Sequence, residues 1–251
     1  MAKVAVILAA AGRSSRFGGE ARRKKPFIDL KGRPVWVRAL EPLIQHPDVV
    51  QSLIVVSPDD LEWFKDKFRP NLAFLNVDVV AGGTDRADSV QNGLAHVRSD
   101  VDFVAIHDAA RPLLVKKWVS DVLSAAEKTG AAILATPISS TVKRVQSHRI
   151  VETVPREELW QAQTPQVFDR KLLMEAFAKR GDLVATDEAQ LVERIGCAVS
   201  IVEGSPLNLK ITTQEDFRMA EVLLEALPRE KTLANLHPFA ADNPHLLKDL
   251  L

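Results

Sequence analysis

The stretch from Val4 to Gly19, VAVILAAAGRSSRFGG, runs from aliphatic residues and alanine directly into a loop of glycines, serines and arginines. Small residues let backbone N–H groups approach a phosphate closely, and arginine adds positive charge with several hydrogen-bond donors. More cations follow at Arg22–Lys25. A solvated basic loop would have the same composition, but a loop directly after an apolar run is placed to clamp a polyphosphate. It has neither the Gly-Lys-Ser/Thr of a Walker A loop nor a Gly-x-Gly-x-x-Gly fingerprint.

A second loop, within AGGTDRADSVQNGL, carries a glycine pair and two carboxylates. The pair Gly82-Gly83 permits close backbone approach to a ligand. Thr84 or Asp85 can cap the following helix, with Asp88 near its third position as in a capping box. Capping alone accounts for Asp85 and Asp88 as well as a functional role does.

Further polar residues are expected near the ends of the same elements. Arg86 and Ser89 are three residues apart, so they face the same way on the predicted helix. Asp108, in IHDAARP, directly follows a predicted strand, a usual position for a carboxylate that holds a metal ion or a ribose hydroxyl. No residue is assigned as a metal ligand, and Asp108 is the one candidate. His107 has no partner at metal-site spacing, so a packed histidine is predicted.

Single basic or hydroxyl residues occur late in the chain, in polar surroundings: Arg156, Thr164, Thr186 and Lys210. Each could be an ordinary surface residue, and together they could form a second anionic site facing the first loop. No Ser-His-Asp constellation, CxxC pair or HExxH motif is present. The chemistry indicated is the stabilisation of phosphates by cations, without a protein nucleophile.

Composition narrows the class of protein. The 251 residues carry 33 basic and 33 acidic side chains, so net charge is zero, which argues against a nucleic-acid partner. The one cysteine, Cys197, suits a reducing compartment and is expected to be a small buried residue. No stretch approaches the ~20 apolar residues of a membrane helix. We therefore expect a cytoplasmic protein without a membrane partner.

Short β-branched runs alternate with helical patterns, which predicts an α/β fold: a parallel sheet with helices on both faces. We expect strands over Val4–Ala10, Ser52–Ser57, Val77–Val80, Phe103–Ile106, Ala132–Ala135, Val199–Val202 and Asn208–Ile211. We expect helices over Pro34–His46, Pro58–Phe68, Asp85–Arg98, Val115–Thr129, Arg170–Lys179, Asp187–Ile195 and Gln214–Leu227.

One segment interrupts this alternation. Ser140–Val154 contains two short alternating runs joined by QSHR, which indicates a β-hairpin although no Asn-Gly turn defines it. Its valines have no place in the parallel sheet, so we expect an arm that pairs with a second copy of the chain. The predicted organisation is one domain over residues 1–227, with the arm at about 138–156 and a tail at 228–251.

The motifs LAAAGRSSRFGG, GGTDRADSVQNGL, IHDAARP, TPQVF, TDEA and VEGSPLNLKIT follow the order found in the 2-C-methyl-D-erythritol 4-phosphate cytidylyltransferase family. The resemblance covers about Val4 to Leu227. It implies a Rossmann-like three-layer nucleotidyltransferase fold, with a mostly parallel sheet and a protruding β-hairpin arm that builds a homodimer. It also implies transfer of CMP from CTP to a sugar-alcohol phosphate with release of pyrophosphate, assisted by a divalent cation, usually Mg²⁺.

The resemblance implies roles for the phosphate and nucleotide contacts. Arg16 and Lys25 match the two cations that stabilise the pentacoordinate α-phosphate. The implied CTP-binding residues are Ala10, Ala11, Gly12, Gly83, Arg86, Ser89 and Asp108.

The resemblance also implies an acceptor site. Arg156 and Lys210 match the residues that position the acceptor phosphate for in-line attack. Thr164 and Thr186 match polar residues of that site. Thr141, in the arm, would reach the site of the partner subunit, which would make the dimer catalytically relevant.

This sequence departs from the family pattern at three places. Ser14 stands where a second glycine is usual, and Thr84 stands where many relatives have aspartate, so Asp85 would take over its contact. The usual Pro-Lys-Gln-Tyr appears as Lys24-Lys25-Pro26-Phe27, so Lys25 or Lys24 is the catalytic lysine. A pentitol phosphate such as ribitol 5-phosphate remains an alternative acceptor, and a non-catalytic nucleotide-binding protein remains an alternative function.

Overall fold

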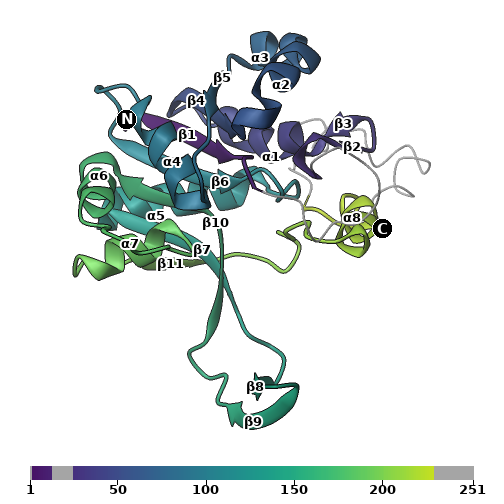
Figure 1. The fold of residues 1–251 in the computed structure, drawn as a ribbon, viewed down its shortest axis with the longest axis vertical. Coiled ribbons are helices and arrows are strands. Elements are labelled where there is room, and N and C mark those ends of the chain that lie inside the picture. The colour runs from purple at the N-terminus through teal and green to yellow at the C-terminus, as the bar shows by residue number, and fades with distance from the viewer. Residues whose placement is uncertain (1, 13–24, 229–251) are drawn as a thin grey trace, which may run out of the picture.

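The computed structural model describes residues 2–12 and 25–228 (Figure 1). Within these ranges, one seven-stranded sheet has the order β11-β7-β10-β6-β1-β4-β5. Its strands are β1 (Val4–Ala9), β4 (Val49–Val56), β5 (Asp78–Ala81), β6 (Phe103–Asp108), β7 (Ala131–Pro137), β10 (Trp160–Asp169) and β11 (Ser200–Glu203). All strand pairs are parallel except those of β10, which runs antiparallel to both β6 and β7. The predicted mostly parallel sheet is confirmed.

Helices cover both faces of this sheet, and the last described helix packs beside it against Leu30, Val35 and Leu113. They are α1 (Val35–Ile44), α2 (Leu61–Lys67), α3 (Arg69–Leu75), α4 (Arg86–Ala95), α5 (Lys116–Thr129), α6 (Arg170–Ala178), α7 (Glu188–Arg194) and α8 (Gln214–Leu223). Short 3₁₀ turns occur at Lys25–Phe27 and Pro58–Asp60, and β2 (Asp29–Leu30) pairs with β3 (Arg33–Pro34). The predicted alternation of strands and helices is therefore observed from β1 to β7.

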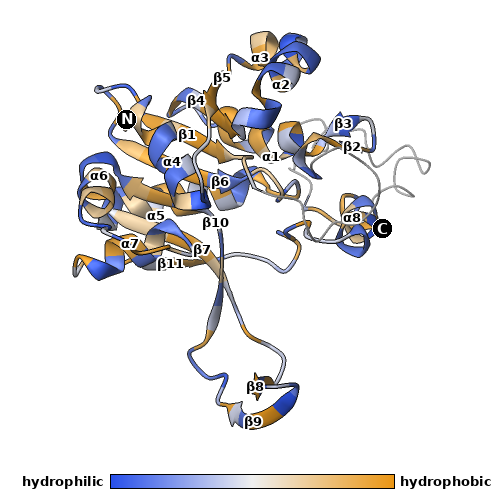
Figure 2. Ribbon diagram, viewed as in Figure 1, coloured by the Kyte–Doolittle hydropathy of each residue, from blue (hydrophilic) through white to orange (hydrophobic). Residues whose placement is uncertain are grey.

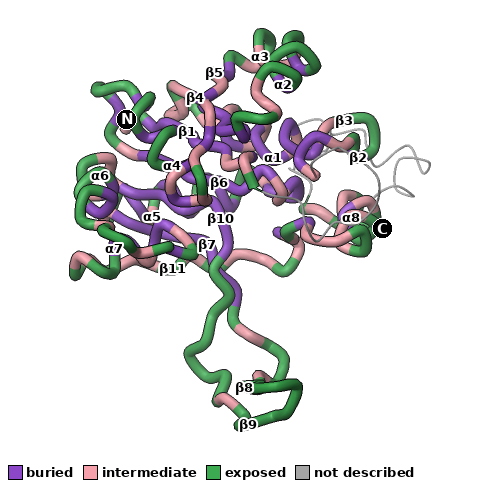
Figure 3. The backbone as a smooth tube through the Cα atoms, viewed as in Figure 1, coloured by how far each residue is buried: buried purple, intermediate pink, exposed green. Residues whose placement is uncertain are grey.

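Strand β1 explains the two core layers. Val4, Val6 and Leu8 pack on one face with α1 and α5, and Ala5 and Ile7 pack on the other with α4, α6 and α7. Both faces of β1 are apolar, which explains why its sequence is a continuous apolar run. The sheet strands are mostly orange in Figure 2 and largely purple in Figure 3, because apolar residues fill both layers.

Two element predictions were wrong in detail. The expected strand Asn208–Ile211 is irregular, because its backbone bonds go to the loop after β6: Ile211 N–H donates to the Ala110 carbonyl, and the Asn208 carbonyl accepts from Arg111. The expected helix Pro58–Phe68 is a 3₁₀ turn followed by α2, and α3 then follows from Arg69.

Strand β10 is a central strand that the sequence pattern does not predict. It contains Gln163, Thr164 and Gln166, which are buried although they are polar. The pairing with β7 shifts register between Ala162 and Gln166, and the Thr164–Pro165 peptide is cis. A strand with buried polar residues and an internal proline lacks the usual period-2 signal.

The predicted hairpin arm is confirmed. Between β7 and β10 the chain projects away from the sheet and forms β8 (Val142–Gln146) and β9 (Arg149–Val154), which pair antiparallel (Figure 1). The two linking residues, Ser147 and His148, have φ of 48° and 61°, so both lie in the left-handed region used by two-residue hairpin turns. The arm is mostly green in Figure 3, and Val145, Ile150 and Val151 are exposed on it.

Among the described residues, the helices are all too short or too polar to cross a membrane.

Candidate functional site

The loops after β1, β5 and β6 lie at one edge of the sheet. Ala10, just beyond β1, donates its backbone N–H to the Val55 carbonyl of β4 at 2.9 Å. Gly82, just beyond β5, donates to the Val56 carbonyl at 2.7 Å, and Ala109, just beyond β6, donates to the Ala9 carbonyl at 3.0 Å. Ligands of open α/β sheets bind at this carboxyl edge. The loops after β1, β5 and β6 therefore lie at this edge.

A close backbone approach joins the first two loops. A Cβ on Gly82 would lie 2.7 Å from the Ala11 Cβ and 3.0 Å from the Ser89 Oγ, so only glycine fits. The Ser89 hydroxyl accepts from the Gly83 N–H at 3.0 Å and donates to the Asp85 carbonyl at 2.7 Å. Ser89 is buried and stabilises the turn that presents Gly83.

The capping interpretation of the carboxylates before α4 is confirmed. Asp85 is the N-cap and accepts from the Asp88 N–H at 2.7 Å, while the Asp88 carboxylate accepts from the Asp85 N–H. Arg180, at the end of α6, also contacts both carboxylates, at 3.6 Å and 2.8 Å. The start of α4 is thus held by its own cap and by a neighbouring cation.

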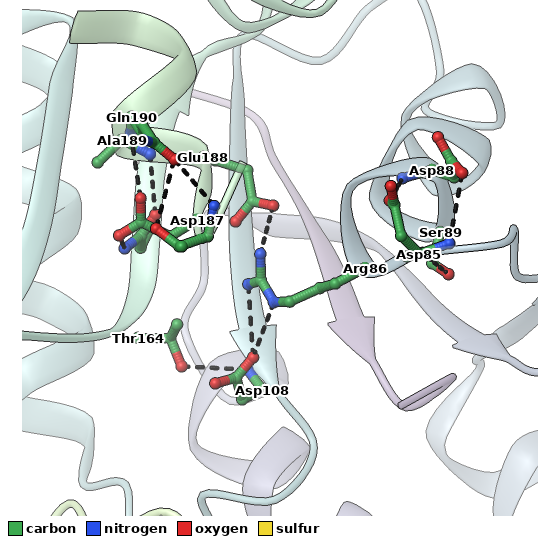
Figure 4. Close-up of polar contacts among 12 residues, drawn as sticks. Asp85, Arg86, Asp88, Ser89, Asp108, Thr164, Asp187, Glu188, Ala189 and Gln190 are labelled. Atoms are coloured by element: carbon green, nitrogen blue, oxygen red, sulfur yellow. Dashed lines mark hydrogen bonds and ion pairs between the residues drawn. The ribbon is translucent and has the colours of Figure 1, made fainter. Parts of the chain in front are cut away.

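Arg86 lies at the first position of α4 and bridges two carboxylates (Figure 4). Its Nη1 donates to Glu188 Oε1 at 2.6 Å, and its Nε and Nη2 lie 3.4 Å from Asp108 Oδ1. Burial disfavours the charged guanidinium, but the two carboxylates outweigh burial and raise the pKa of Arg86. Arg86 is therefore a fixed positive charge at the edge of the sheet.

Asp108 lies among three cations. Lys210 Nζ is 2.7 Å from its Oδ2, Arg111 Nε is 3.6 Å from the same oxygen, and Arg86 contacts Oδ1. Burial would raise the pKa of Asp108, yet Arg86, Lys210 and Arg111 hold it well below its usual range. Burial lowers the pKa of Arg111, which Asp108 opposes. Asp108 is thus an ionised carboxylate that organises the surrounding cations.

These groups surround a cavity of about 220 Å³. It is lined by Arg86, Asp108, Arg111, Ala162, Gln163, Thr164, Gln166, Thr186, Asp187 and Lys210. Three cations and two carboxylates line it, so the lining is net positive. Planar guanidinium groups and an ammonium suit the recognition of a phosphate.

A buried chain of hydrogen bonds through Thr164 and His107 supports the backbone of Asp108. The Thr164 hydroxyl accepts from the Asp108 N–H at 3.0 Å and lies 2.9 Å from His107 Nδ1. His107 Nε2 lies 3.1 Å from the Arg111 carbonyl, which can only accept, so Nε2 carries the proton and Thr164 donates to Nδ1. Burial lowers the pKa of His107 to about 4. The packed histidine is confirmed, and the Thr164 hydroxyl is engaged in supporting Asp108.

The segment after β11 carries Lys210 to this cavity. Asn208 is fully buried and donates to the Thr164 carbonyl at 2.9 Å and to Gln163 Oε1 at 3.2 Å. Further along, the Thr212 carbonyl accepts from Lys25 Nζ at 3.0 Å. One irregular segment therefore connects Lys210 and Lys25.

The remaining predicted residues are more scattered. Gly12 is exposed after β1, and Thr186 lines the cavity with its hydroxyl 3.4 Å from Gln190 Oε1. Thr141 and Arg156 are exposed on the arm, away from the cavity lining, and the Arg156 guanidinium donates to the Ser139 carbonyl. Predictions for Arg13, Ser14, Ser15, Arg16, Arg22, Arg23 and Lys24 lie outside the described residues, as does the tail after Pro228.

Three residues that contribute to the site were not predicted from the sequence. Arg111 stands three residues after Asp108 in IHDAARP, Glu188 stands two after Thr186 in ATDEA, and Gln166 is in TPQVF. All three lie within the motifs that carry the family resemblance, and their place in those motifs could have identified them. Arg111 contacts Asp108, Glu188 contacts Arg86, and Gln166 contacts Asp187 at the start of α7. The last two contacts form only when distant segments pack together.

The fold and site define an α/β nucleotide-binding class of protein, with a cationic anion site at the carboxyl edge of a mostly parallel sheet. Comparison of the sequence with known families narrows this class. The chain belongs to the 2-C-methyl-D-erythritol 4-phosphate cytidylyltransferase family, whose sequence profile matches residues 4–226.

Curated relatives agree with this assignment. A 2-C-methyl-D-erythritol 4-phosphate cytidylyltransferase of Endomicrobium trichonymphae is 40% identical over 225 residues, which cover 89% of this chain and 100% of the relative. The enzyme of the same name from Solibacter usitatus is 39% identical over 243 residues, covering 92% of this chain and 100% of its own.

Solved structures share the fold. A crystal structure of 4-diphosphocytidyl-2C-methyl-D-erythritol synthase superposes with a TM-score of 0.75 at 32% identity, covering 89% of this chain and 99% of the other. The 2-C-methyl-D-erythritol 4-phosphate cytidylyltransferase of Thermus thermophilus gives 0.73 at 31% identity, covering 89% and 98%. The Rossmann-like nucleotidyltransferase fold implied by the motifs is confirmed.

Proposed function

We propose that this chain transfers CMP from CTP to 2-C-methyl-D-erythritol 4-phosphate, with release of pyrophosphate. The product would be 4-diphosphocytidyl-2-C-methyl-D-erythritol, an intermediate of isoprenoid precursor biosynthesis. The observation that carries the proposal is the net-positive cavity around Asp108, at the same sheet edge as the loop after β1. The family match over residues 4–226 includes both the cavity residues and this loop.

The reaction joins two anions. A phosphate oxygen of the acceptor attacks the α-phosphorus of CTP, and the bond from that phosphorus to the bridging oxygen of pyrophosphate breaks. The protein must offset their repulsion and hold the reacting atoms in line. Fixed charges and effective molarity together supply on the order of 10 kcal/mol of barrier reduction. Arg16 and Lys25 are proposed to stabilise the charge that develops at the α-phosphate.

The CTP site is proposed at the loops after β1 and β5. The backbone of Ala10, Ala11 and Gly12 would follow the phosphates, and Gly83 and Ser89 would face the nucleoside from the start of α4. Support comes from the close approach of Gly82, in the loop after β5, to Ala11, in the loop after β1. Arg86 at the start of α4 and Asp108, which pairs with Ala9 at the end of β1, would complete the proposed site.

The acceptor site is proposed around Lys210, Thr164 and Thr186, which line one cavity. Lys210 and Arg156 would position the acceptor phosphate. Arg156 and Thr141 lie on the arm, outside the lining of this cavity, so we propose that they act on the site of a second copy in a homodimer. The exposed apolar face of the arm supports such a dimer.

A divalent cation, Mg²⁺ by family resemblance, is proposed as cofactor. Among the described residues, no group of three or more His, Cys, Asp or Glu side chains could hold a metal ion. Mg²⁺ commonly binds through one or two carboxylates together with substrate phosphates. Asp108 is the candidate carboxylate, and an ion held there would share it with Arg86, Arg111 and Lys210. Bound there with CTP, the ion would neutralise phosphate charge.

We further propose a single cytidylyltransferase domain over residues 1–227, followed by a separate tail. The lone cysteine, Cys197, is partly buried in the core layer that contains α7, which suits a cytoplasmic location.

Pyrophosphate release tests the function. Purified protein, Mg²⁺ and CTP are supplied with 2-C-methyl-D-erythritol 4-phosphate in one reaction and ribitol 5-phosphate in another. Release with the first acceptor alone is expected. Release with the second alone would reassign the acceptor, and CTP binding without release in either would indicate a non-catalytic nucleotide-binding protein.

A further inference from the structure

A buried glutamate beside the cavity has no role in the chemistry proposed above. Glu188 is the first residue of α7, is 1% exposed and does not line the cavity. Its Oε1 accepts from Arg86, and its Oε2 is buried with no hydrogen-bond partner among the described residues. A buried ion pair adds little net stability, because desolvation of two charges offsets their attraction. The geometry of Arg86 is a better explanation for this carboxylate.

The backbone of Glu188 is held firmly. Gln166, on the central strand β10, donates its Nε2 to Asp187 Oδ2 at 2.8 Å and accepts from the Ala189 N–H at 3.2 Å. These two bonds enclose Glu188, and Asp187 also caps α7 by accepting from the Gln190 N–H (Figure 4). Glu188 therefore has little freedom to follow a movement of Arg86.

Arg86 divides its donors unequally between two carboxylates. Its contact with Glu188 is 2.6 Å, whereas its contacts with Asp108 are 3.4 Å. Asp108 in turn makes its short contact, 2.7 Å, with Lys210. Without the charge of Glu188, Asp108 would be the only carboxylate that Arg86 still contacts in this network, and Arg86 would compete with Lys210 for it.

We propose that Glu188 is a positioning residue that holds Arg86 away from Asp108. Arg86 then presents its charge to CTP, and Asp108 stays paired with Lys210. Glu188 acts through Arg86 and touches neither substrate. This inference rests on the proposed function, in which Arg86 belongs to the CTP site and Lys210 to the acceptor site.

A double-mutant cycle tests the proposal. The variants are Glu188→Gln, which keeps the side-chain shape, Arg86→Gln, and the double variant. Glu193→Gln is the matched control, because Glu193 is exposed on the same helix. For each protein we would measure the KM for CTP and kcat in pyrophosphate release, the Kd for CTP by calorimetry, and thermal unfolding.

Glu188→Gln is expected to raise the KM and the Kd for CTP about tenfold or more, with a smaller change in kcat. The double variant is expected to bind CTP no more weakly than Arg86→Gln alone, because the effect of Glu188 passes through Arg86. Glu193→Gln is expected to match the unchanged protein.

The proposal is overturned if Glu188→Gln binds CTP like Glu193→Gln, or if the two losses multiply in the double variant. Should Glu188→Gln alone fold poorly, the comparison of Arg86→Gln with the double variant still decides, since any further loss of CTP affinity overturns the proposal. A wild-type protein that binds CTP but releases no pyrophosphate would refute the proposed function. The Kd cycle would still test the role of Glu188.

Discussion

Two arginine–glutamate pairs of nearly equal length lie in opposite surroundings. In the arm, Arg144 Nε and Glu152 Oε1 are 2.5 Å apart, with side chains 65% and 51% exposed. Beside the cavity, Arg86 Nη1 and Glu188 Oε1 are 2.6 Å apart, with side chains 27% and 1% exposed. Water screens the first pair, whereas the second lies in a low-dielectric site where each charge must be paired. Equal distances therefore correspond to different roles.

The same contrast applies to the two regions as a whole. The cavity is organised by contacts within one chain: His107, Thr164, Asp108 and Asn208 form a continuous buried network. The arm exposes Val145, Ile150 and Val151 to 56%, 65% and 57%. A two-stranded hairpin with an exposed apolar face is marginal alone. The cavity is preorganised, while the arm fits a structure completed by a second chain.

The largest effect is expected at the proposed catalytic centre. Lys25→Ala should lower turnover at least about a hundredfold, the scale of losing one charge contact in the transition state. The fold should persist, because the adjacent Phe27 remains packed among Phe64 and Phe68. Steady-state pyrophosphate release measures the turnover, and thermal unfolding shows whether the fold persists. Lys143→Ala, on the arm, is the control, and near-normal turnover of Lys25→Ala would instead assign the role to Lys24.

A pH effect on stability should come from the cavity and not from the arm. His107 has a pKa of about 4 when folded, against 6.5 as its ordinary value. Between these values the unfolded chain binds a proton that the folded chain does not, so stability falls as pH drops from 6.5 to 4. The loss amounts to about 3 kcal/mol.

Urea unfolding at pH 4.5 and 7 would show this loss in the wild-type protein. His107→Gln should show a smaller pH dependence, because its amide does not titrate. His148→Gln, at the exposed turn of the arm, should retain the wild-type dependence. Equal pH dependence in all three proteins would contradict a neutral buried His107.

Disruption of the apolar face of the arm should affect oligomeric state more strongly than catalysis in the cavity. Ile150→Asp is expected to shift the protein from dimer to monomer in sedimentation, because the charge would be buried between copies. If the proposed dimer forms, activity should fall about tenfold, the scale of losing the hydrogen bonds proposed for Thr141 of the other copy. Lys143→Gln is the control. A wild-type protein that sediments as a monomer would refute the dimer assignment.

The smallest effect is expected for the exposed pair of the arm. Glu152→Gln should change the free energy of unfolding by less than about 1 kcal/mol, because water screens its contact with Arg144. Chemical denaturation would measure it, with Glu193→Gln as a second surface substitution. A loss of several kcal/mol would show that the arm is as tightly organised as the cavity.

Much of the fold follows from local patterns in the sequence. The continuous apolar run of β1 predicts a strand buried on both faces, and Asp85 with Asp88 predicts the capping box of α4. The alternating arm predicts a hairpin. Strand β10 escapes such reasoning, because its buried glutamines and threonine are satisfied by hydrogen bonds from β6, α7 and the segment after β11.

The sequence by itself determined the residue types of the candidate site and the loops that carry them, since buried strands deliver polar residues to one edge of a sheet. The tertiary structure alone decided which of these charges meet. Glu188 and Arg86 are far apart in the chain, and only the packing of α4 and α7 on the same face brings them to 2.6 Å. Burial then makes the contact matter, because a charge removed from water must find its partner within the protein.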